Sequence, residues 1–254
     1  MTFEEVSNSV SVEPTVDELV AQGRVEAVAR AQVRKFLSVV PDLLDWLATN
    51  GRVYPWRQTT DPWRVYMSEI LLQRTRADAV ESIYDDFFQT FPDPESILLA
   101  NEESIYELVR PLGFGNQRTR TLRDAATIIR EDYGGQVPED LDALQRPWRA
   151  GPYCARATLL FAFGVSIELV DTNFVRVFSR VFDYEMPSQP HKRDQVYQLI
   201  RGVTPTDPEL ARAFNLAILD IGAVICEQSS PECYHCPLRE GCAYPEESQN
   251  AVSQ

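Results

Sequence analysis

Apolar residues recur along this chain at the spacing of α-helices. Four long segments are bounded by prolines and contain none internally: 62–92, 111–138, 152–187 and 208–231. In the first segment the apolar positions with helical spacing are Val65, Ile70, Leu71, Leu72, Val80, Ile83, Tyr84, Phe87 and Phe88. No stretch shows the period-two alternation of a half-buried strand. The pattern therefore predicts an all-α protein.

The composition is that of a globular chain able to bury a core, since 44% of the 254 residues are apolar and 24% are charged. This length suggests one large or two modest domains. The chain has no apolar run of about 18 residues, and its N-terminal segment has acids where a signal peptide needs bases. We therefore expect no membrane partner and a cytoplasmic location.

The net charge of −14 is the unusual feature: there are 38 acids and 24 bases, and only Lys35 and Lys192 are lysines. A phosphate-binding domain is usually basic, so the net charge alone argues against a nucleic-acid partner. An acid excess with few lysines is also typical of adaptation to a salty cytoplasm, where charges are screened.

The charge is unevenly distributed along the chain. Residues 1–23 hold five acids and no base, and we treat residues 1–30 as an acidic N-terminal extension. By contrast, residues 110–123 hold four arginines, residues 143–167 hold three, and neither stretch contains an acid. These two acid-free stretches either form a local anion-binding face or reflect chance clustering on a solvated surface. Residues 246–254 are predicted to be a polar tail.

Four of the five cysteines lie close together near the C-terminus. Cys226, Cys233, Cys236 and Cys242 have the spacing C-x6-C-x2-C-x5-C. A cytoplasmic location argues against disulfides. Four thiolates in a compact loop suit either a tetrahedral zinc ion or an iron–sulfur cluster, and the residues alone leave both open. Cys154 precedes an apolar run and is predicted to be a buried structural thiol.

The turn 113–118 (GFGNQR) is a candidate phosphate contact. Gly113 and Gly115 would let backbone N–H groups approach an anion closely, and Arg118 adds a charge. The competing interpretation is an ordinary turn between two helices.

Two acidic residues each have a structural and a chemical interpretation. Asp171 precedes a helical pattern, where a side-chain oxygen accepts backbone N–H groups as an N-cap. Glu69 lies within an apolar helical run. If Glu69 faces the core, burial raises its pKa and makes it a candidate proton donor; otherwise it marks an exposed edge of the helix.

Taken together, these motifs resemble one family. The cysteine spacing, the turn 147–153 before an apolar helix, and Asp171 eighteen residues after Tyr153 are similar to the helix-hairpin-helix (HhH-GPD) DNA glycosylases with an iron–sulfur cluster, the superfamily of endonuclease III. The likeness runs from about Tyr54 to Tyr244. It is greatest to the thymine-DNA mismatch glycosylases, in the stretches SEILLQRT, IYDDFF, GFGNQRT, DYGGQVP and VDTNFVRV.

The resemblance implies a fold and a cofactor. It implies a two-lobed, all-α helix-hairpin-helix glycosylase fold. Residues 64–165, which contain the hairpin, would form a helical barrel lobe, and residues 31–63 and 166–245 would form the cluster lobe. It also implies that the four cysteines bind a 4Fe–4S cluster rather than zinc.

The resemblance also implies roles for single residues. Asp171 matches the catalytic aspartate of the family, and Glu69 matches a glutamate of the base pocket. Tyr153 stands where endonuclease III has its Schiff-base lysine. Gln73 and Arg74 match the segment that fills the hole left by a flipped base. The other residues with an implied supporting or DNA-binding role are Asn173, Gly113, Gly115, Gln117, Arg118, Arg149 and Gly151.

One position departs from the family pattern. The hairpin of the family reads roughly L-P-G-V-G, but here the first glycine is Arg149 and only Gly151 remains. A left-handed backbone at Arg149 costs about 1–2 kcal/mol relative to glycine. Either the turn is reshaped, or Arg149 adds a side-chain phosphate contact in place of a backbone contact.

The expected function is base excision from double-stranded DNA by a monomeric, monofunctional glycosylase without lyase activity. Its expected substrate is thymine or uracil opposite guanine, which places the protein on the nucleoid when it is bound to DNA. One alternative is an adenine glycosylase acting opposite guanine or 8-oxoguanine. The alternative from another class is a non-catalytic iron–sulfur DNA-binding protein, suggested by the altered hairpin and the net charge.

Overall fold

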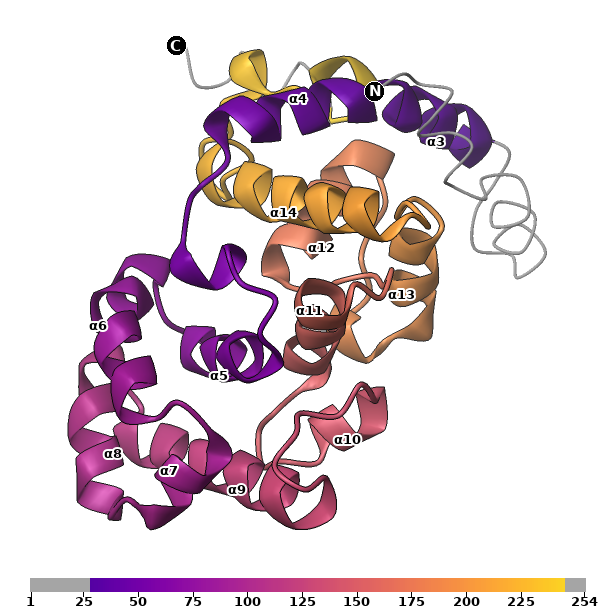
Figure 1. Cartoon of the computed structure of the whole chain (residues 1–254). Helices are drawn as coiled ribbons and strands as arrows, with labels where there is room; N and C mark the ends of the chain where they lie inside the picture. Colours follow the sequence, from indigo (N-terminus) through magenta and orange to yellow (C-terminus); the bar gives the residue numbers. More distant parts are fainter. Residues whose placement is uncertain (1–27, 245–254) are drawn as a thin grey trace. The chain divides into compact units, whose positions relative to one another are not determined.

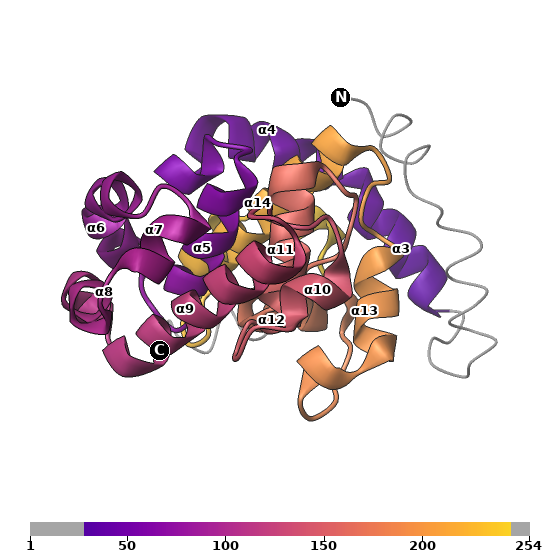
Figure 2. The ribbon, with the colours of Figure 1, turned by 60° about the horizontal axis from the view of Figure 1, so that its bottom comes forward.

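The computed structural model describes residues 28–244, and these form helices joined by loops (Figure 1, Figure 2). Residues 28–244 contain no β-strand, which confirms the predicted all-α class. The polar tail 246–254 and nearly all of the acidic extension 1–30 lie outside the described residues. No helix in the described part of the chain has the length and apolar character needed to cross a membrane.

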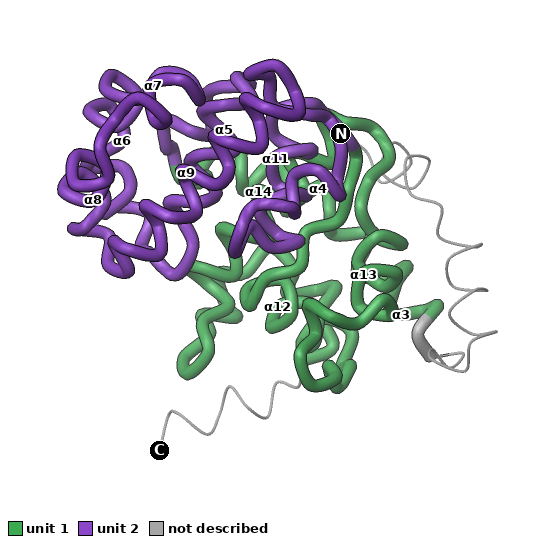
Figure 3. The backbone as a smooth tube through the Cα atoms, turned by 90° about the horizontal axis from the view of Figure 1, so that it is seen from below, with its two compact units in different colours: residues 1–52, 166–254 green, residues 53–165 purple. Residues whose placement is uncertain are grey.

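The chain divides into two compact units (Figure 3). We call residues 53–165 the middle unit, and residues 1–52 together with 166–254 the two-segment unit. The division between residues 165 and 166 coincides with the lobe boundary expected from the sequence.

The other expected boundary, between residues 63 and 64, is corrected by the structure, because residues 53–63 belong to the middle unit. Their aromatic side chains pack within that unit. The Trp56 ring lies 6.0 Å from the Tyr84 ring between centroids, and the Trp63 indole N–H donates to the Phe91 carbonyl over 3.0 Å.

The middle unit is arranged around one buried helix, α5. Its elements are η1 (Pro55–Arg57), α5 (Pro62–Leu72), α6 (Ala77–Thr90), α7 (Pro94–Leu99), α8 (Glu102–Val109), η2 (Arg110–Leu112), α9 (Gly115–Asp132), α10 (Leu141–Gln145) and α11 (Pro152–Phe163). Most side chains of α5 are buried, as in a core helix. Helix α5 packs against α11, and α9 packs against α7 and α8 (Figure 2).

Short polar side chains begin several of these helices. Asp61, Asp93, Asn101 and Asp140 each accept the backbone N–H three residues further on, at 2.7–2.8 Å. Such an N-cap stabilises a helix by about 1 kcal/mol, because it satisfies a backbone donor that has no partner inside the helix. The starts of α5, α7, α8 and α10 are therefore determined locally.

The two-segment unit joins sequence from both ends of the described chain. Its elements are α3 (Val28–Ser38), α4 (Val40–Asn50), α12 (Thr172–Phe182), η3 (Pro190–Lys192), α13 (Asp194–Arg201), α14 (Pro208–Val224), η4 (Cys233–His235) and η5 (Arg239–Gly241). Phe36 of α3 packs against Phe178, Phe182 and Phe214, with ring centroids 5.4–6.2 Å apart. The Gln32 amide donates to the carbonyls of Val181 and Gly241. These contacts bring the two segments into one core.

Candidate functional site

Asp171 begins α12 and caps it. Its Oδ1 accepts the Phe174 backbone N–H over 2.8 Å, which confirms the predicted N-cap. Burial raises the pKa of this carboxyl above its usual value. The hydrogen bonds from the Phe174 and Asn173 groups and the charge of Arg176 oppose that rise. The carboxylate is therefore partly withdrawn from water but has its own donors.

Asn173 lies directly beside Asp171, as the sequence suggested. Its amide nitrogen donates to Oδ2 of Asp171 over 3.1 Å, and its amide oxygen accepts from Nη2 of Arg176 over 2.8 Å. Gly222 of α14 approaches this side chain so closely that an added Cβ would lie 2.6 Å from the Asn173 Cβ. Only glycine at 222 leaves Asn173 in this place.

Arg176 is a residue that the sequence analysis did not single out. Besides Asn173, its guanidinium donates to the carbonyls of Cys226 over 2.7 Å and of Gly222 over 2.5 Å. Hydrogen bonds thus lead from the Asp171 carboxylate through Asn173 and Arg176 to the backbone of the first clustered cysteine. The available signal was the helical spacing of Asn173 and Arg176 within VDTNFVRV.

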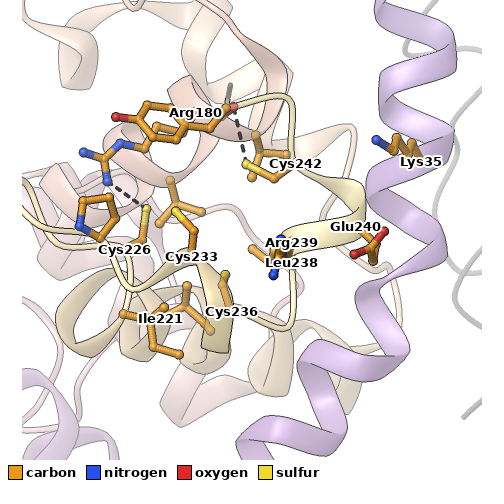
Figure 4. A pocket seen from close by; sticks show the side chains of 15 residues that line it. Lys35, Arg180, Ile221, Cys226, Cys233, Cys236, Leu238, Arg239, Glu240 and Cys242 are labelled. Carbon is orange, nitrogen blue, oxygen red and sulfur yellow. Dashed lines mark hydrogen bonds between the residues drawn. The ribbon is translucent and has the colours of Figure 1, made fainter. Parts of the chain in front are cut away.

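The four clustered cysteines line one cavity of about 250 Å³ in the two-segment unit (Figure 4). Arg180 donates to Sγ of Cys226 over 3.2 Å, and Sγ of Cys242 donates to the Arg180 carbonyl over 3.6 Å. Burial raises the pKa of the Cys236 thiol to about 12. Among residues 28–244, no group of three or more Cys, His, Asp or Glu side chains is arranged to hold a single metal ion. The four thiols thus share the lining of one cavity.

Glu69 and Tyr153 lie in the middle unit. Glu69 of α5 is buried, with 6% of its surface exposed. Helix α5 packs against α11, and next to the half-buried Tyr153 at the start of α11 lies Cys154. Burial and then the Glu69 charge raise the pKa of the Cys154 thiol well above its usual value. Cys154 is thus the buried thiol expected from the sequence, and Glu69 faces the core beside it.

Arg118 was expected to contact DNA, and the structure corrects this. Only 4% of its surface is exposed. Its guanidinium donates to the carbonyls of Gly113, Ile70, Leu71 and Gln73 and to the Thr75 hydroxyl. A guanidinium has five N–H donors, and all are used here. No donor remains for a phosphate, and Arg118 instead caps the carboxyl end of α5, where the helix dipole favours a cation.

The glycine turn before α9 exposes an aromatic residue. Gly113 has φ 78° and the next residue, Phe114, has φ 54° and 52% exposure. Gly115 is needed for packing, because an added Cβ would lie 2.7 Å from the Tyr106 ring. Gln117 follows and is exposed. Phe114 is a second residue that the sequence analysis missed, although a large apolar side chain between two glycines was a visible signal.

The hairpin between α10 and α11 keeps the left-handed backbone that its sequence disfavours. Arg149 has φ 66°, whereas Gly151 has φ −82° and is the N-cap of α11. The turn is therefore not reshaped, at a cost of about 1–2 kcal/mol relative to glycine. The Gln73 amide donates to the Arg149 carbonyl over 3.1 Å. Arg74, next to Gln73, is exposed and also has a positive φ, 55°.

Comparison with known proteins places this hairpin in a family. Residues 67–202, which include α10, the hairpin, α11 and Asp171, match the family described as "HhH-GPD superfamily base excision DNA repair protein". The chain belongs to this superfamily.

Similar HhH-GPD proteins match over most of the chain. The thymine-DNA glycosylase of Aeropyrum pernix is 33% identical over 225 residues, which cover 88% of this chain and 96% of that protein. The thymine/uracil-DNA glycosylase of Methanothermobacter thermautotrophicus is 36% identical over 82% of this chain and 93% of its own length. The structure of a thermostable thymine-DNA glycosylase superposes with a TM-score of 0.79 at 34% identity, covering 85% of this chain and 99% of that one.

The residues matched to the HhH-GPD family include only part of the candidate site. Glu69, Tyr153, Asp171 and Asn173 lie within residues 67–202, whereas the four clustered cysteines lie beyond residue 202. The cysteine site is therefore supported by the donor set and the surrounding cavity rather than by the family match itself.

Proposed function

We propose that this chain is a monomeric, monofunctional DNA glycosylase that hydrolyses the N-glycosidic bond of thymine or uracil opposite guanine in double-stranded DNA. The observation that carries the proposal is the Asp171 carboxylate, which begins α12 with one donor on each oxygen. The similarity to thymine and thymine/uracil glycosylases over most of their length supports this substrate class.

The chemistry requires a carboxylate of this kind. A base inside a duplex cannot be reached, so it must be flipped out, and a mispaired base is the easiest to unpair. As the glycosidic bond breaks, positive charge develops on the sugar. Ionised Asp171 would stabilise that charge or orient the attacking water, and its two fixed hydrogen bonds hold the oxygens in place without reorganisation.

The departing base needs a proton or hydrogen bonds as it becomes anionic. Glu69 is the candidate donor, since its carboxyl group is buried in α5 at the position where the family has a glutamate of the base pocket. Tyr153 at the start of α11 has no amine and cannot form a Schiff base. Hydrolysis without strand cleavage is therefore the expected outcome.

Binding would use the exposed turns of the middle unit. Gln73 and Arg74 lie on the turn after α5, and Phe114 lies on the turn before α9. Arg118 joins these two turns by donating to the carbonyls of Gln73 and Gly113. The three side chains are therefore candidates to fill the space left by the flipped base. The backbone N–H groups of Gly115 and Gly151, together with the exposed Gln117 and Arg149 side chains, are candidates for phosphate contacts. The Gly113 N–H, also expected from the sequence, instead donates to the Arg110 carbonyl over 3.0 Å.

We infer that Cys226, Cys233, Cys236 and Cys242 hold a 4Fe–4S cluster. Four thiols around one cavity fit this group, since each thiolate binds a different iron. The alternative, a zinc ion, would need the four thiolates to converge on one point at about 2.3 Å. The cluster would supply cross-links that order the loop after α14, and the Cys226 carbonyl would remain free to accept from Arg176.

A panel of duplexes tests the proposal. Purified protein is incubated with T:G, U:G, A:G and A:8-oxoguanine duplexes, and strand breaks are measured with and without alkali. We expect breaks with T:G and U:G only, and only after alkali. Release of adenine alone would instead support the adenine glycosylase alternative. Binding without release from any duplex would support the non-catalytic one.

A further inference from the structure

Most arginines of the two acid-free stretches already have partners in the folded chain. Arg110 pairs with Glu107 at 3.0 Å, Arg146 pairs with Asp132 at 2.6 Å, and Arg118 is bonded internally. Arg120 and Arg149 are different. Both are exposed, and among the described residues neither guanidinium has a hydrogen-bond or ion-pair partner.

These two guanidinium groups share one aromatic platform, Trp148. The Cζ atom of Arg120 lies 4.4 Å from the centroid of the Trp148 ring, and that of Arg149 lies 5.2 Å from it. A cation–π contact attracts the guanidinium to the ring without using its N–H donors, which stay available for a bidentate acceptor. Two oriented cations with free donors therefore come together from α9 and from the hairpin.

The platform itself is fixed to α9. The Trp148 backbone N–H donates to Oδ2 of Asp124 over 2.6 Å. Asp124 lies one helical turn after Arg120 on the same face of α9. Asp124 thus anchors the hairpin through Oδ2, and it forms no ion pair with Arg120 among the described residues.

The backbone supports a role for the Arg149 side chain. Arg149 holds a left-handed conformation that glycine would adopt without strain. Strained backbone conformations of this kind occur preferentially at functional sites, where the surrounding structure holds the residue in place.

We infer that Arg120 and Arg149, positioned by Trp148, bind backbone phosphates of double-stranded DNA. Side-chain contacts would then replace the backbone contact that a glycine at position 149 would allow. The inference rests on the proposed function for the identity of the polyanion as DNA. It adds Arg120 and Trp148, which lie on separate segments, to the binding surface.

The salt dependence of DNA binding tests this inference. Binding of an undamaged duplex is measured over a series of KCl concentrations for the wild type, Arg120→Gln, Arg149→Gln and the double variant. Each phosphate contact contributes about 0.9 to the slope of log K against log salt concentration. We expect the slope to fall by about 0.9 in each single variant and by about 1.8 in the double variant.

Arg130→Gln is the matched control, because Arg130 is exposed on the same helix α9 and pairs with Glu95 at 2.8 Å. Its slope should equal that of the wild type.

Arg149→Gly provides a readout that a purely structural role would not produce. Its Tm should rise by about 2–4 °C because the strain is relieved, while the slope of its salt dependence falls by about 0.9, as in Arg149→Gln. Double-variant slopes equal to those of Arg130→Gln would overturn the inference.

The failure of this inference can be distinguished from the failure of the proposed function. Thymine release from a T:G duplex is measured with the same wild-type protein. Release by the wild type, with a normal salt slope in the double variant, would refute only the phosphate contact by Arg120 and Arg149. An arginine-dependent slope without base release would support the contact and refute the glycosylase.

Discussion

Asn173 donates its side-chain amide to Oδ2 of Asp171, while the other carboxylate oxygen accepts the Phe174 backbone N–H. Each oxygen of the aspartate thus has one fixed donor. The N-cap and the proposed catalytic role are compatible in this arrangement, because the helix start that orders Asp171 also favours its anionic form. Burial works in the opposite direction and raises its pKa.

Asp171→Asn should abolish base release and stabilise the fold. The amide keeps most of the capping but removes the charge that faces the developing cation, so release should fall by at least about 10²–10⁴-fold. Since burial disfavours the charged carboxylate, Tm should rise at neutral pH, and this gain should shrink as the pH falls through the raised pKa of Asp171. Asp207→Asn is the control, because Asp207 caps α14 in the same way through the Leu210 N–H.

The rate of base release should decline in acid at a pH above the ordinary aspartate pKa of about 3.9, because Asp171 must be ionised. Arg176→Gln removes a charge that lowers the pKa of Asp171, so its acid limb should lie at still higher pH. Single-turnover rates measured across a pH series locate the acid limb of the wild type and that of Arg176→Gln. Lys192→Gln removes an exposed cation from the same unit and should match the wild type. Coincident limbs for Arg176→Gln and the wild type would show that Arg176 does not act on Asp171.

Arg118→Lys should destabilise the protein by about 1–3 kcal/mol, because an ammonium has three donors for the five acceptors that surround this position. Urea denaturation measures the loss. Arg130→Lys changes an exposed arginine of the same helix and should stay within about 0.5 kcal/mol of the wild type. Equal stability of the two variants would mean that the hydrogen bonds of Arg118 contribute nothing net.

Protein purified without oxygen should contain about four irons and four labile sulfides per chain. Cys233→Ser should lose iron and unfold more easily, because the loop after α14 has no other cross-link. Cys154→Ala should keep the iron, since Cys154 is buried in the middle unit. Stoichiometric zinc in the wild type would contradict the cluster assignment.

Borohydride should trap no covalent adduct between the wild-type protein and DNA. The sequence has only two lysines, Lys35 and Lys192, and the position of the Schiff-base lysine is occupied by Tyr153, which has no amine. Tyr153→Lys should introduce some trapping, because it places an amine at the position of the Schiff-base lysine. Tyr153→Phe controls for loss of the hydroxyl. Adduct formation by the wild type at the level of Tyr153→Lys would show that another amine reacts.

The helices were largely predictable because their signals are local. Prolines and apolar spacing locate α9 and α14, and aspartates mark several starts. The break between α5 and α6 was not predictable, since no proline or glycine lies in residues 73–76. The chain turns there through Arg74 with φ 55°, in a turn that Arg118 of α9 holds by tertiary hydrogen bonds.

The candidate site likewise combines residues that the sequence reveals with contacts that only the folded chain reveals. Asp171 and the four cysteines were recognisable from spacing along the chain. The contact between Gly222 and Asn173 was not, because it joins α14 to α12. Charge alone also misassigned Arg118 and gave no reason to prefer Arg120, since composition does not say whether a guanidinium is buried against carbonyls or stacked on Trp148.

The buried Arg118 also determines how the turn after α5 can open. Exposing residues 73–75 to water would take two of the five acceptors, the Gln73 carbonyl and the Thr75 hydroxyl, away from the buried Arg118 cation, so the turn cannot open alone at low cost. Its local unfolding is thereby coupled to the loss of the first turn of α9. The segment that carries Gln73 and Arg74 is therefore held in one backbone conformation from inside the middle unit, although Arg74 is exposed at the surface.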